Sequence, residues 1–156
     1  MFTAKLFIKK VGYFTKKNYE KMPEDVNLIL EQVKKNYKNI NLNNMAIVGA
    51  DIGANIAIIA AKDMKKKPVT MILICPTRTF KGLYTPIALT DLNIPILTMA
   101  SLKDSYSLDE QKQLAKFAQG GFYAQNYPEG GMGMLMLKAN PEMSQDITKW
   151  IVKWLK

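Results

Sequence analysis

The chain has 156 residues, 48% of them hydrophobic, with one cysteine and no histidine. This length suits a single domain over residues 1–156 with a core of its own. One cysteine excludes an internal disulfide framework and a cysteine-based zinc cluster. The absence of histidine excludes the serine–histidine–acid triad, the cysteine–histidine dyad and any histidine-ligated metal. Much of the usual hydrolytic chemistry is therefore excluded, and we expect no cofactor.

The charge balance is basic, because 22 lysines and arginines against 13 acidic residues give a net charge of +9. The basic residues are nearly all lysines spread along the chain, and Arg78 is the single arginine. Proteins that read bases and phosphates favour the planar arginine fork, so nucleic-acid binding is disfavoured. No apolar run approaches the ~20 residues that cross a bilayer, and lysines interrupt the apolar residues of the N-terminus. We therefore expect a cytoplasmic protein with no membrane span and no signal peptide.

The N-terminal segment, residues 1–22, is predicted to be a strand or arm of uncertain role, with β-rich residues over 5–14. A helix is expected after this segment, because Pro23 suits a first helical turn. Val26 and Val33 belong to a set of apolar residues that then recur at helical spacing.

Strands and helices alternate through the rest of the chain. The predicted strands cover residues 45–48, 69–75, 94–100 and 122–127, and the predicted helices cover residues 52–64, 107–119 and 143–155. Several of the strands are apolar throughout, which is typical of strands buried on both faces. This alternation predicts a three-layer α/β/α fold with a mostly parallel sheet and helices on both faces.

The junction over residues 47–55, which reads IVGADIGAN, carries the most chemical information. It predicts a strand, a sharp turn and a helix, with Gly49 and Gly53 two residues to either side of Asp51. Small residues at those positions let the chain reverse tightly and expose the central side chain above the sheet, over the first N–H groups of the helix. This is the nucleophile-elbow pattern G-x-S-x-G with Asp51 in the serine position. On the motif alone, Asp51 serves equally well as the N-cap of the helix.

Two later stretches also begin where strands end. Residues 99–106, which read MASLKDSY, place Asp104 in the loop after a strand. Residues 127–134, which read YPEGGMGM, form a glycine-rich loop between the last strand and the last helix. Nucleophile elbow, then acid, then loop is the chain order of an α/β-hydrolase.

Together these motifs resemble the α/β-hydrolase family, in particular the bacterial dienelactone hydrolases and small esterases. Members of that family show a G-A-S-I-G-A-N-like elbow, an A-S-x-x-D acid loop and a Y-P-x-x-x-H-G loop, where this chain reads GADIGAN, ASLKD and YPEGGMG. The resemblance covers residues 23–156 and corresponds to the C-terminal two-thirds of the family. It implies a truncated α/β-hydrolase fold that lacks the family's opening strands.

Carried over residue by residue, the resemblance implies that Asp104 is the triad acid, while Asp51 stands at the nucleophile's position and Met132 at the histidine's. The backbone N–H of Ile52 is the oxyanion donor that can be carried over. A covalent aspartate still needs a positioned base to activate water, and an ordinary carboxylate is a weak base near neutral pH. We therefore predict a ligand-binding or interaction module with a degenerate triad. The alternative is a hydrolase of a carboxylester or related small substrate that uses Asp51 and Asp104.

Two further expectations concern partners. Arg78 follows a strand end on the same side as Asp51 and Asp104, so it is a candidate to pair with either carboxylate or to bind a ligand carboxylate; a solvated surface arginine is the simpler interpretation. In the family the elbow strand is interior, and loss of the opening strands leaves an apolar edge that soluble proteins normally cover. We expect that residues 2–14 cover this edge or that two chains pair there as a homodimer.

Overall fold

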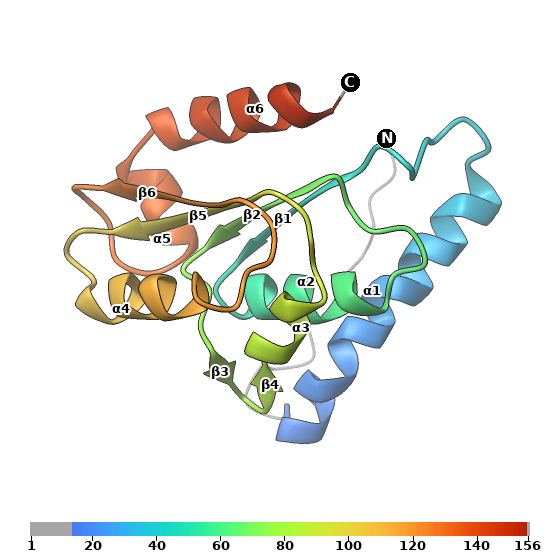
Figure 1. Ribbon diagram of the computed structural model, residues 1–156, viewed down its shortest axis with the longest axis horizontal. Coiled ribbons are helices and arrows are strands. Elements are labelled where there is room, and N and C mark those ends of the chain that lie inside the picture. Colours follow the sequence, from blue (N-terminus) through green and yellow to red (C-terminus); the bar gives the residue numbers. More distant parts are fainter. Residues whose placement is uncertain (1–13, 156) are drawn as a thin grey trace.

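The computed structural model describes residues 14–155 (Figure 1). Its strands are β1 (Ala46–Ala50), β2 (Thr70–Ile74), β3 (Thr79–Phe80), β4 (Leu83–Tyr84), β5 (Ile96–Ser101) and β6 (Phe122–Tyr127). Its helices are α1 (Lys16–Asn36), α2 (Ile52–Asp63), α3 (Pro86–Thr90), α4 (Ser105–Leu114), α5 (Met134–Ala139) and α6 (Glu142–Trp154).

Four of the strands form one sheet in the order β1-β2-β5-β6, and each neighbouring pair is parallel. Helix α6 lies over one face of the sheet, while α2 and α4 lie over the other with α1 packed outside α2 (Figure 1). This arrangement confirms the predicted three-layer α/β/α class. Because the strands are parallel, their carboxyl ends meet at one edge of the sheet, where the chain turns toward the helices.

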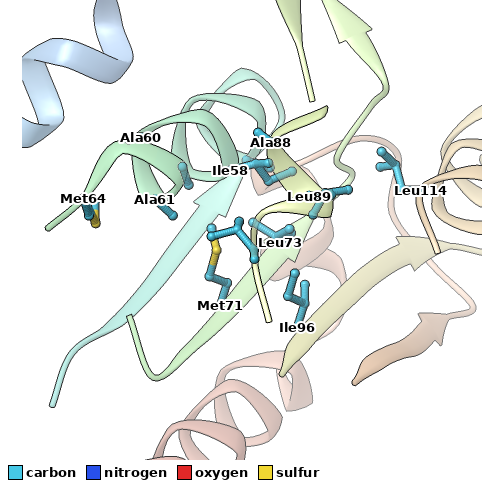
Figure 2. Close-up of a cluster of buried hydrophobic side chains, with 13 residues drawn as sticks. Ile58, Ala60, Ala61, Met64, Met71, Leu73, Ala88, Leu89, Ile96 and Leu114 are labelled. Atoms are coloured by element: carbon cyan, nitrogen blue, oxygen red, sulfur yellow. The ribbon is translucent and has the colours of Figure 1, made fainter. Parts of the chain in front are cut away.

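The core is divided by the sheet because successive side chains of a strand point to opposite faces. Met71 and Leu73 of β2 join a cluster with residues of α2, α3, β5 and α4 (Figure 2). Ile72 and Ile74 join a second cluster with residues of β5, β6, α5 and α6. All five residues of β2 are buried, which explains why the four residues after Thr70 are apolar without alternation.

The first helix begins earlier than the sequence predicts. Helix α1 starts at Lys16, so residues 16–22 of the predicted arm are helical and Pro23 lies inside the helix. The start is set by Thr15, whose backbone N–H donates to Oδ1 of Asn18 at 2.8 Å, one half of a capping box. The prediction of a strand over residues 5–14 concerns positions that lie outside the described residues, apart from Phe14, which is not in a strand.

Three short elements were not predicted: helix α3, helix α5 and the hairpin of β3 and β4. The hairpin turns through Lys81 and Gly82, whose φ angles are +50° and +90°. Two central residues with positive φ are typical of the tight turns that join antiparallel strands. The turn was not predicted because its first central residue is a lysine, whereas such turns usually have Asn, Asp or Gly there.

Strand β1 lies at one end of the sheet, and among residues 14–155 it pairs with β2 alone. Its central residue Val48 is 48% exposed, although its neighbour Gly49 is buried. Among the same residues, no helix combines the length and the apolar character needed to cross a membrane.

Candidate functional site

The predicted elbow is a sharp reversal between β1 and α2, centred on Asp51. The φ and ψ angles of Asp51 are +50° and −123°, which is a strained conformation for a residue with a side chain. The reversal is held by the Asp51 backbone N–H, which donates to the carbonyl oxygen of Ile74 at 2.9 Å. The structure therefore has the backbone of an elbow. Asp51 also stands at the N-cap position of α2, but its side chain makes no capping hydrogen bond to the helix, so the capping interpretation of that side chain is wrong.

The two glycines of the motif have different roles. A Cβ on Gly49 would lie 2.5 Å from the carbonyl oxygen of Gly53 and 2.8 Å from Cα of Ala54. Gly49 is therefore required by the close approach of β1 to the first turn of α2. A Cβ on Gly53 would meet no atom within 4 Å, so packing does not require that glycine.

The Asp51 carboxylate is confined at the carboxyl edge of the sheet. Its Oδ1 is buried and has no hydrogen-bond partner among the described residues. A Cβ on Gly133 would collide with the carboxylate, so the backbone of Gly133 lies directly against it. Burial, and then the nearby negative charge of Asp104, raise the pKa of Asp51 above its ordinary value. A raised pKa is consistent with a carboxyl group that has lost water without gaining a cation.

Asp104, the candidate triad acid, is hydrogen-bonded within its own loop. Its Oδ1 accepts from the backbone N–H of Ser107 at 3.1 Å, and its Oδ2 accepts from the Ser107 hydroxyl at 2.6 Å. These contacts make Asp104 the N-cap of α4. Both carboxylate oxygens are thus engaged in the start of the helix, although the charge is close enough to act on Asp51.

Cys75 is a member of this edge that sequence reasoning did not identify. It directly follows β2, has a φ of +50° and is 1% exposed. Its Sγ accepts from the backbone N–H of Gly133 at 3.3 Å. Burial raises the pKa of the Cys75 thiol, although its contacts with Gly133 and Ser107 act in the other direction. The available signal was the position of Cys75 at the end of β2, which lies between β1 and β5, the strands that precede Asp51 and Asp104.

The loop after β6 is anchored at several points. The Ser101 hydroxyl donates to the carbonyl oxygen of Gly130 at 2.7 Å, and Lys103 forms an ion pair with Glu129 at 2.6 Å. Met132, at the expected histidine position, is 48% exposed. The next residue, Gly133, has a φ of +56° and contacts Asp51. The part of this loop that contacts the Asp51 carboxylate is thus the backbone of Gly133, not the side chain of Met132.

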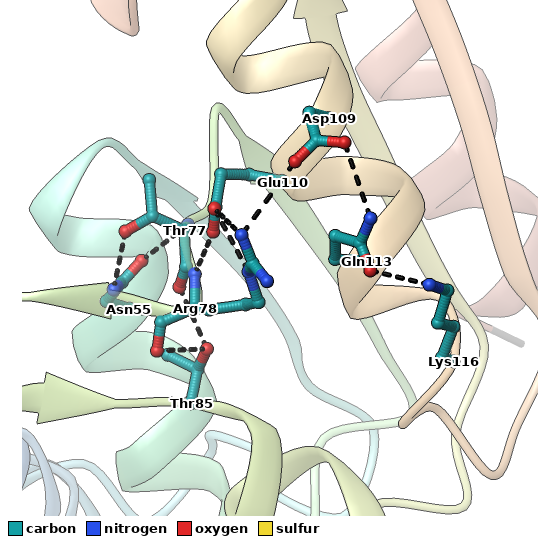
Figure 3. Close-up of polar contacts among 8 residues, drawn as sticks. All are labelled: Asn55, Thr77, Arg78, Thr85, Asp109, Glu110, Gln113 and Lys116. Carbon is teal, nitrogen blue, oxygen red and sulfur yellow. Dashed lines mark hydrogen bonds and ion pairs between the residues drawn. The ribbon is translucent and has the colours of Figure 1, made fainter.

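Arg78 is bound to α4 (Figure 3). Its Nη2 and Nε donate to Oε1 of Glu110 at 2.6 and 3.0 Å, and its backbone N–H donates to Oε2 at 2.5 Å. Asp109 lies 3.8 Å from the same guanidinium group. These contacts join the turn after β2 to α4. Arg78 therefore pairs with Glu110 and Asp109, and not with Asp51 or Asp104 as the sequence suggested. Whether Arg78 also binds a ligand carboxylate stays a prediction.

The same turn is joined to α2 by Asn55. The Asn55 side chain accepts from the backbone N–H of Thr77 and donates to its hydroxyl, both at 3.0 Å (Figure 3). Since Asn55 is fully buried, these bonds satisfy an amide that would otherwise be costly. The turn at residues 76–78 therefore holds α2 and α4 at fixed positions on either side of the site.

The candidate oxyanion donor, the N–H of Ile52, is placed by the elbow. Ile52 is the first residue of α2, where N–H groups have no partner within the helix. Two clefts among the described residues lie away from this edge. One of about 350 Å³ lies between α1, α2, β4 and α3, and one of about 720 Å³ lies beyond the opposite end of β1.

Comparison of the fold with solved structures defines its class. The chain superimposes on a dienelactone hydrolase from Anabaena variabilis with a TM-score of 0.76 and 14% identity, covering 89% of this chain and 62% of that one. An acetyl xylan esterase from Paenibacillus sp. R4 gives 0.70 and 13%, covering 88% and 54%. A Bacillus cereus carboxylesterase gives 0.66 and 19%, covering 91% and 64%. No family model and no curated protein matches the sequence.

The chain therefore has an α/β-hydrolase-like fold, as the sequence resemblance predicted. It spans less than two thirds of the length of each of these three structures. At identities below 20% the likeness concerns the arrangement of strands and helices and leaves the chemistry of the site to be argued from its residues.

Replacing Gly133 with alanine should destabilise the fold. The left-handed backbone alone costs about 1–2 kcal/mol for a residue with a side chain, and the collision with Asp51 adds to that cost. Urea denaturation gives the free energy of unfolding. Gly131→Ala is the matched control, because a Cβ there meets no atom within 4 Å. Equal stabilities of the two variants would contradict the contact between Gly133 and Asp51.

Asp51→Asn should stabilise the protein more at neutral than at acidic pH. A carboxyl group with a raised pKa contributes favourably below its unfolded pKa, and that contribution is lost as the pH rises through the folded value. The advantage of the variant should therefore grow as the pH rises from about 4 and then level off. Urea denaturation between pH 4 and 8 measures it. Asp25→Asn removes the same charge from an exposed site on α1, and a parallel response there would contradict the assignment to Asp51.

Proposed function

We propose that this chain is a non-catalytic relative of α/β-hydrolases that acts as a ligand-binding or interaction module. The observation that carries the proposal is the position of Gly133. Its backbone lies against the Asp51 carboxylate, on the side where the loop after β6 meets the elbow. A catalytic base would have to approach Asp51 from this loop, and the loop presents a backbone there.

The chemistry of the neighbouring residues supports the same proposal. An aspartyl ester formed on Asp51 would have to be hydrolysed by a water that a base activates. Met132 has no group that accepts a proton at neutral pH. Asp104 accepts two hydrogen bonds from Ser107, and these bonds hold it as a helix cap. Neither Met132 nor Asp104 is therefore arranged to activate a water at Asp51.

The alternative function is hydrolysis of a carboxylester or a related small substrate through Asp51 and Asp104. It is favoured by the strained backbone of Asp51 and by its raised pKa, since strain and perturbed pKa values collect at catalytic sites. A carboxylate with a raised pKa is also a better base at neutral pH than an ordinary one. The N–H of Ile52 would then stabilise the developing oxyanion.

As an interaction module, the chain is proposed to pair with a second copy along β1. The support is the position of β1 at the end of the sheet and the exposure of Val48. Apart from Phe14, residues 2–14, the other expected cover of this edge, lie outside the described residues. A strand edge with no partner among residues 14–155 presents a row of N–H and carbonyl groups that another strand can join. A homodimer would join the two sheets without a change in either elbow.

Assays with short-chain nitrophenyl esters and haloalkanes should detect no turnover by the wild type above that of Asp51→Asn. The physical reason is that no described residue is positioned to activate water at Asp51. Turnover that is present in the wild type and abolished in Asp51→Asn would establish the alternative. As a companion, Asp51→Ser combined with Met132→His should gain little esterase activity, because Gly133 still confines the elbow; strong activity would contradict that explanation.

Light scattering should give the mass of a dimer for the wild type and that of a monomer for Val48→Lys. A lysine on an edge strand opposes edge-to-edge pairing, because the two copies would bring like charges close together across the joined strands. Val152→Lys introduces the same charge on α6, where the side chain is 68% exposed, and should leave the dimer intact. A monomeric wild type, or dissociation by both variants alike, would refute pairing along β1.

A further inference from the structure

We propose that the cleft at the amino end of β1 binds a fatty-acid-type amphiphile, an alkyl chain with a carboxylate head. The cleft has a volume of about 720 Å³, within the usual range of small-molecule sites. Its walls are the second half of α1, the segment over residues 40–45 and the end of α2 with the residues that follow. Met45 precedes β1 whereas Asp51 follows it, so this cleft is separate from the elbow.

The inner lining of the cleft is suited to an alkyl chain. It is formed by Leu30, Ile40, Leu42, Met45 and Met64. Leu30 and Met45 also pack against the core cluster below the sheet, while Ile40 is 48% exposed. The apolar surface therefore runs from the core to the solvent. An alkyl chain that covers it removes apolar area on both sides from water, which is the main source of affinity for such ligands.

The rim of the cleft is suited to an anion. It carries Lys34, Lys35, Lys65 and Lys66, against the two acids Glu31 and Asp63. Within residues 14–155, none of these four lysines forms an ion pair. The positive charge of the four lysines exceeds the negative charge of the two acids together with that of the C-terminal ends of α1 and α2, which is about half a unit each. The excess positive charge selects an anionic head group over a neutral or cationic one.

Asn27 supplies a polar point inside the cleft. Its Nδ2 donates to the carbonyl oxygen of Ala60 at 3.3 Å, which fixes the orientation of the amide. Its Oδ1 is buried and has no donor among the described residues. An acceptor of this kind is normally satisfied by a water or a ligand group, so a bound water could bridge Asn27 to an occupant.

The charge of the rim disfavours two other occupants. Residues 1–13 carry three lysines and no acidic residue, so this segment would add like charge to the rim. A basic peptide from another protein meets the same repulsion. A surface of anionic lipid would satisfy the lysines but would leave the apolar interior of the cleft empty. The carboxylate amphiphile satisfies both parts.

Titration calorimetry of the full chain with dodecanoate below its micellar concentration tests the proposal. Dodecanoate should bind at least about tenfold more tightly than dodecyltrimethylammonium, which has the same chain and the opposite charge. Lys65→Glu with Lys66→Glu should weaken dodecanoate binding about tenfold. Lys112→Glu with Lys116→Glu, at exposed positions of α4 and of the turn that follows it, makes the same change in net charge and should leave the affinity within about twofold.

Two further measurements keep the test decisive. Ile40→Asn, at an exposed position, should weaken binding about threefold or more by removing apolar contact, without removing a charge. If the Lys65 and Lys66 variant fails to fold, Lys34→Glu with Lys35→Glu replaces it. Equal binding of the two amphiphiles, an equal effect of the two lysine pairs, or binding to phosphatidylglycerol vesicles without binding of monomeric dodecanoate would overturn the proposal. These outcomes do not depend on Asp51 or on the dimer.

Discussion

The contact between Gly49 and the first turn of α2 is the constraint on which the candidate site depends. With no side chain at position 49, the end of β1 lies against the backbone of Gly53 and Ala54, and the chain must reverse within one residue. That residue is Asp51, which accepts a positive φ as the cost of the reversal. The parallel register then places the end of β2 beside it and the ends of β5 and β6 further along the same edge of the sheet, where an elbow carboxylate, a buried thiol and a helix-capping acid lie.

The fold was predictable because its signals are local or periodic. Strand β6 begins and ends where the sequence predicts, and the four residues of β2 after Thr70 form the apolar run of a strand buried on both faces. The errors arose where a weak local signal met a stronger one. Pro23 suggested a first helical turn, yet the capping contact between Thr15 and Asn18 starts the helix about two turns earlier. A proline inside a helix costs one hydrogen bond, and the buried position of Pro23 offsets part of that cost.

The position of the candidate site in the fold was predictable, and the contacts of its residues were less so. The motif order placed Asp51 and Asp104 at the same edge, and the structure brings their charges within reach of each other. The motif does not reveal that Ser107 occupies both oxygens of Asp104, because capping depends on the geometry of the following turn. The motif also aligns Met132 with the position of the family's histidine, whereas the residue that contacts Asp51 is Gly133. That contact requires two separate reversals of the chain to face each other, which no spacing within one segment encodes.

Because Cys75 is buried, its reactivity depends on the opening of the carboxyl edge of the sheet. This is the single thiol of the protein, it is 1% exposed, and the backbone of Gly133 covers its sulfur. A thiol reacts as its thiolate, and burial raises its pKa, so the closed state is protected twice. Alkylation therefore requires a separation of the segments that contact this sulfur, which include the loop after β6 and Met136 of α5. The rate at which Cys75 is labelled therefore reports the stability of this edge of the sheet separately from that of the distant cleft.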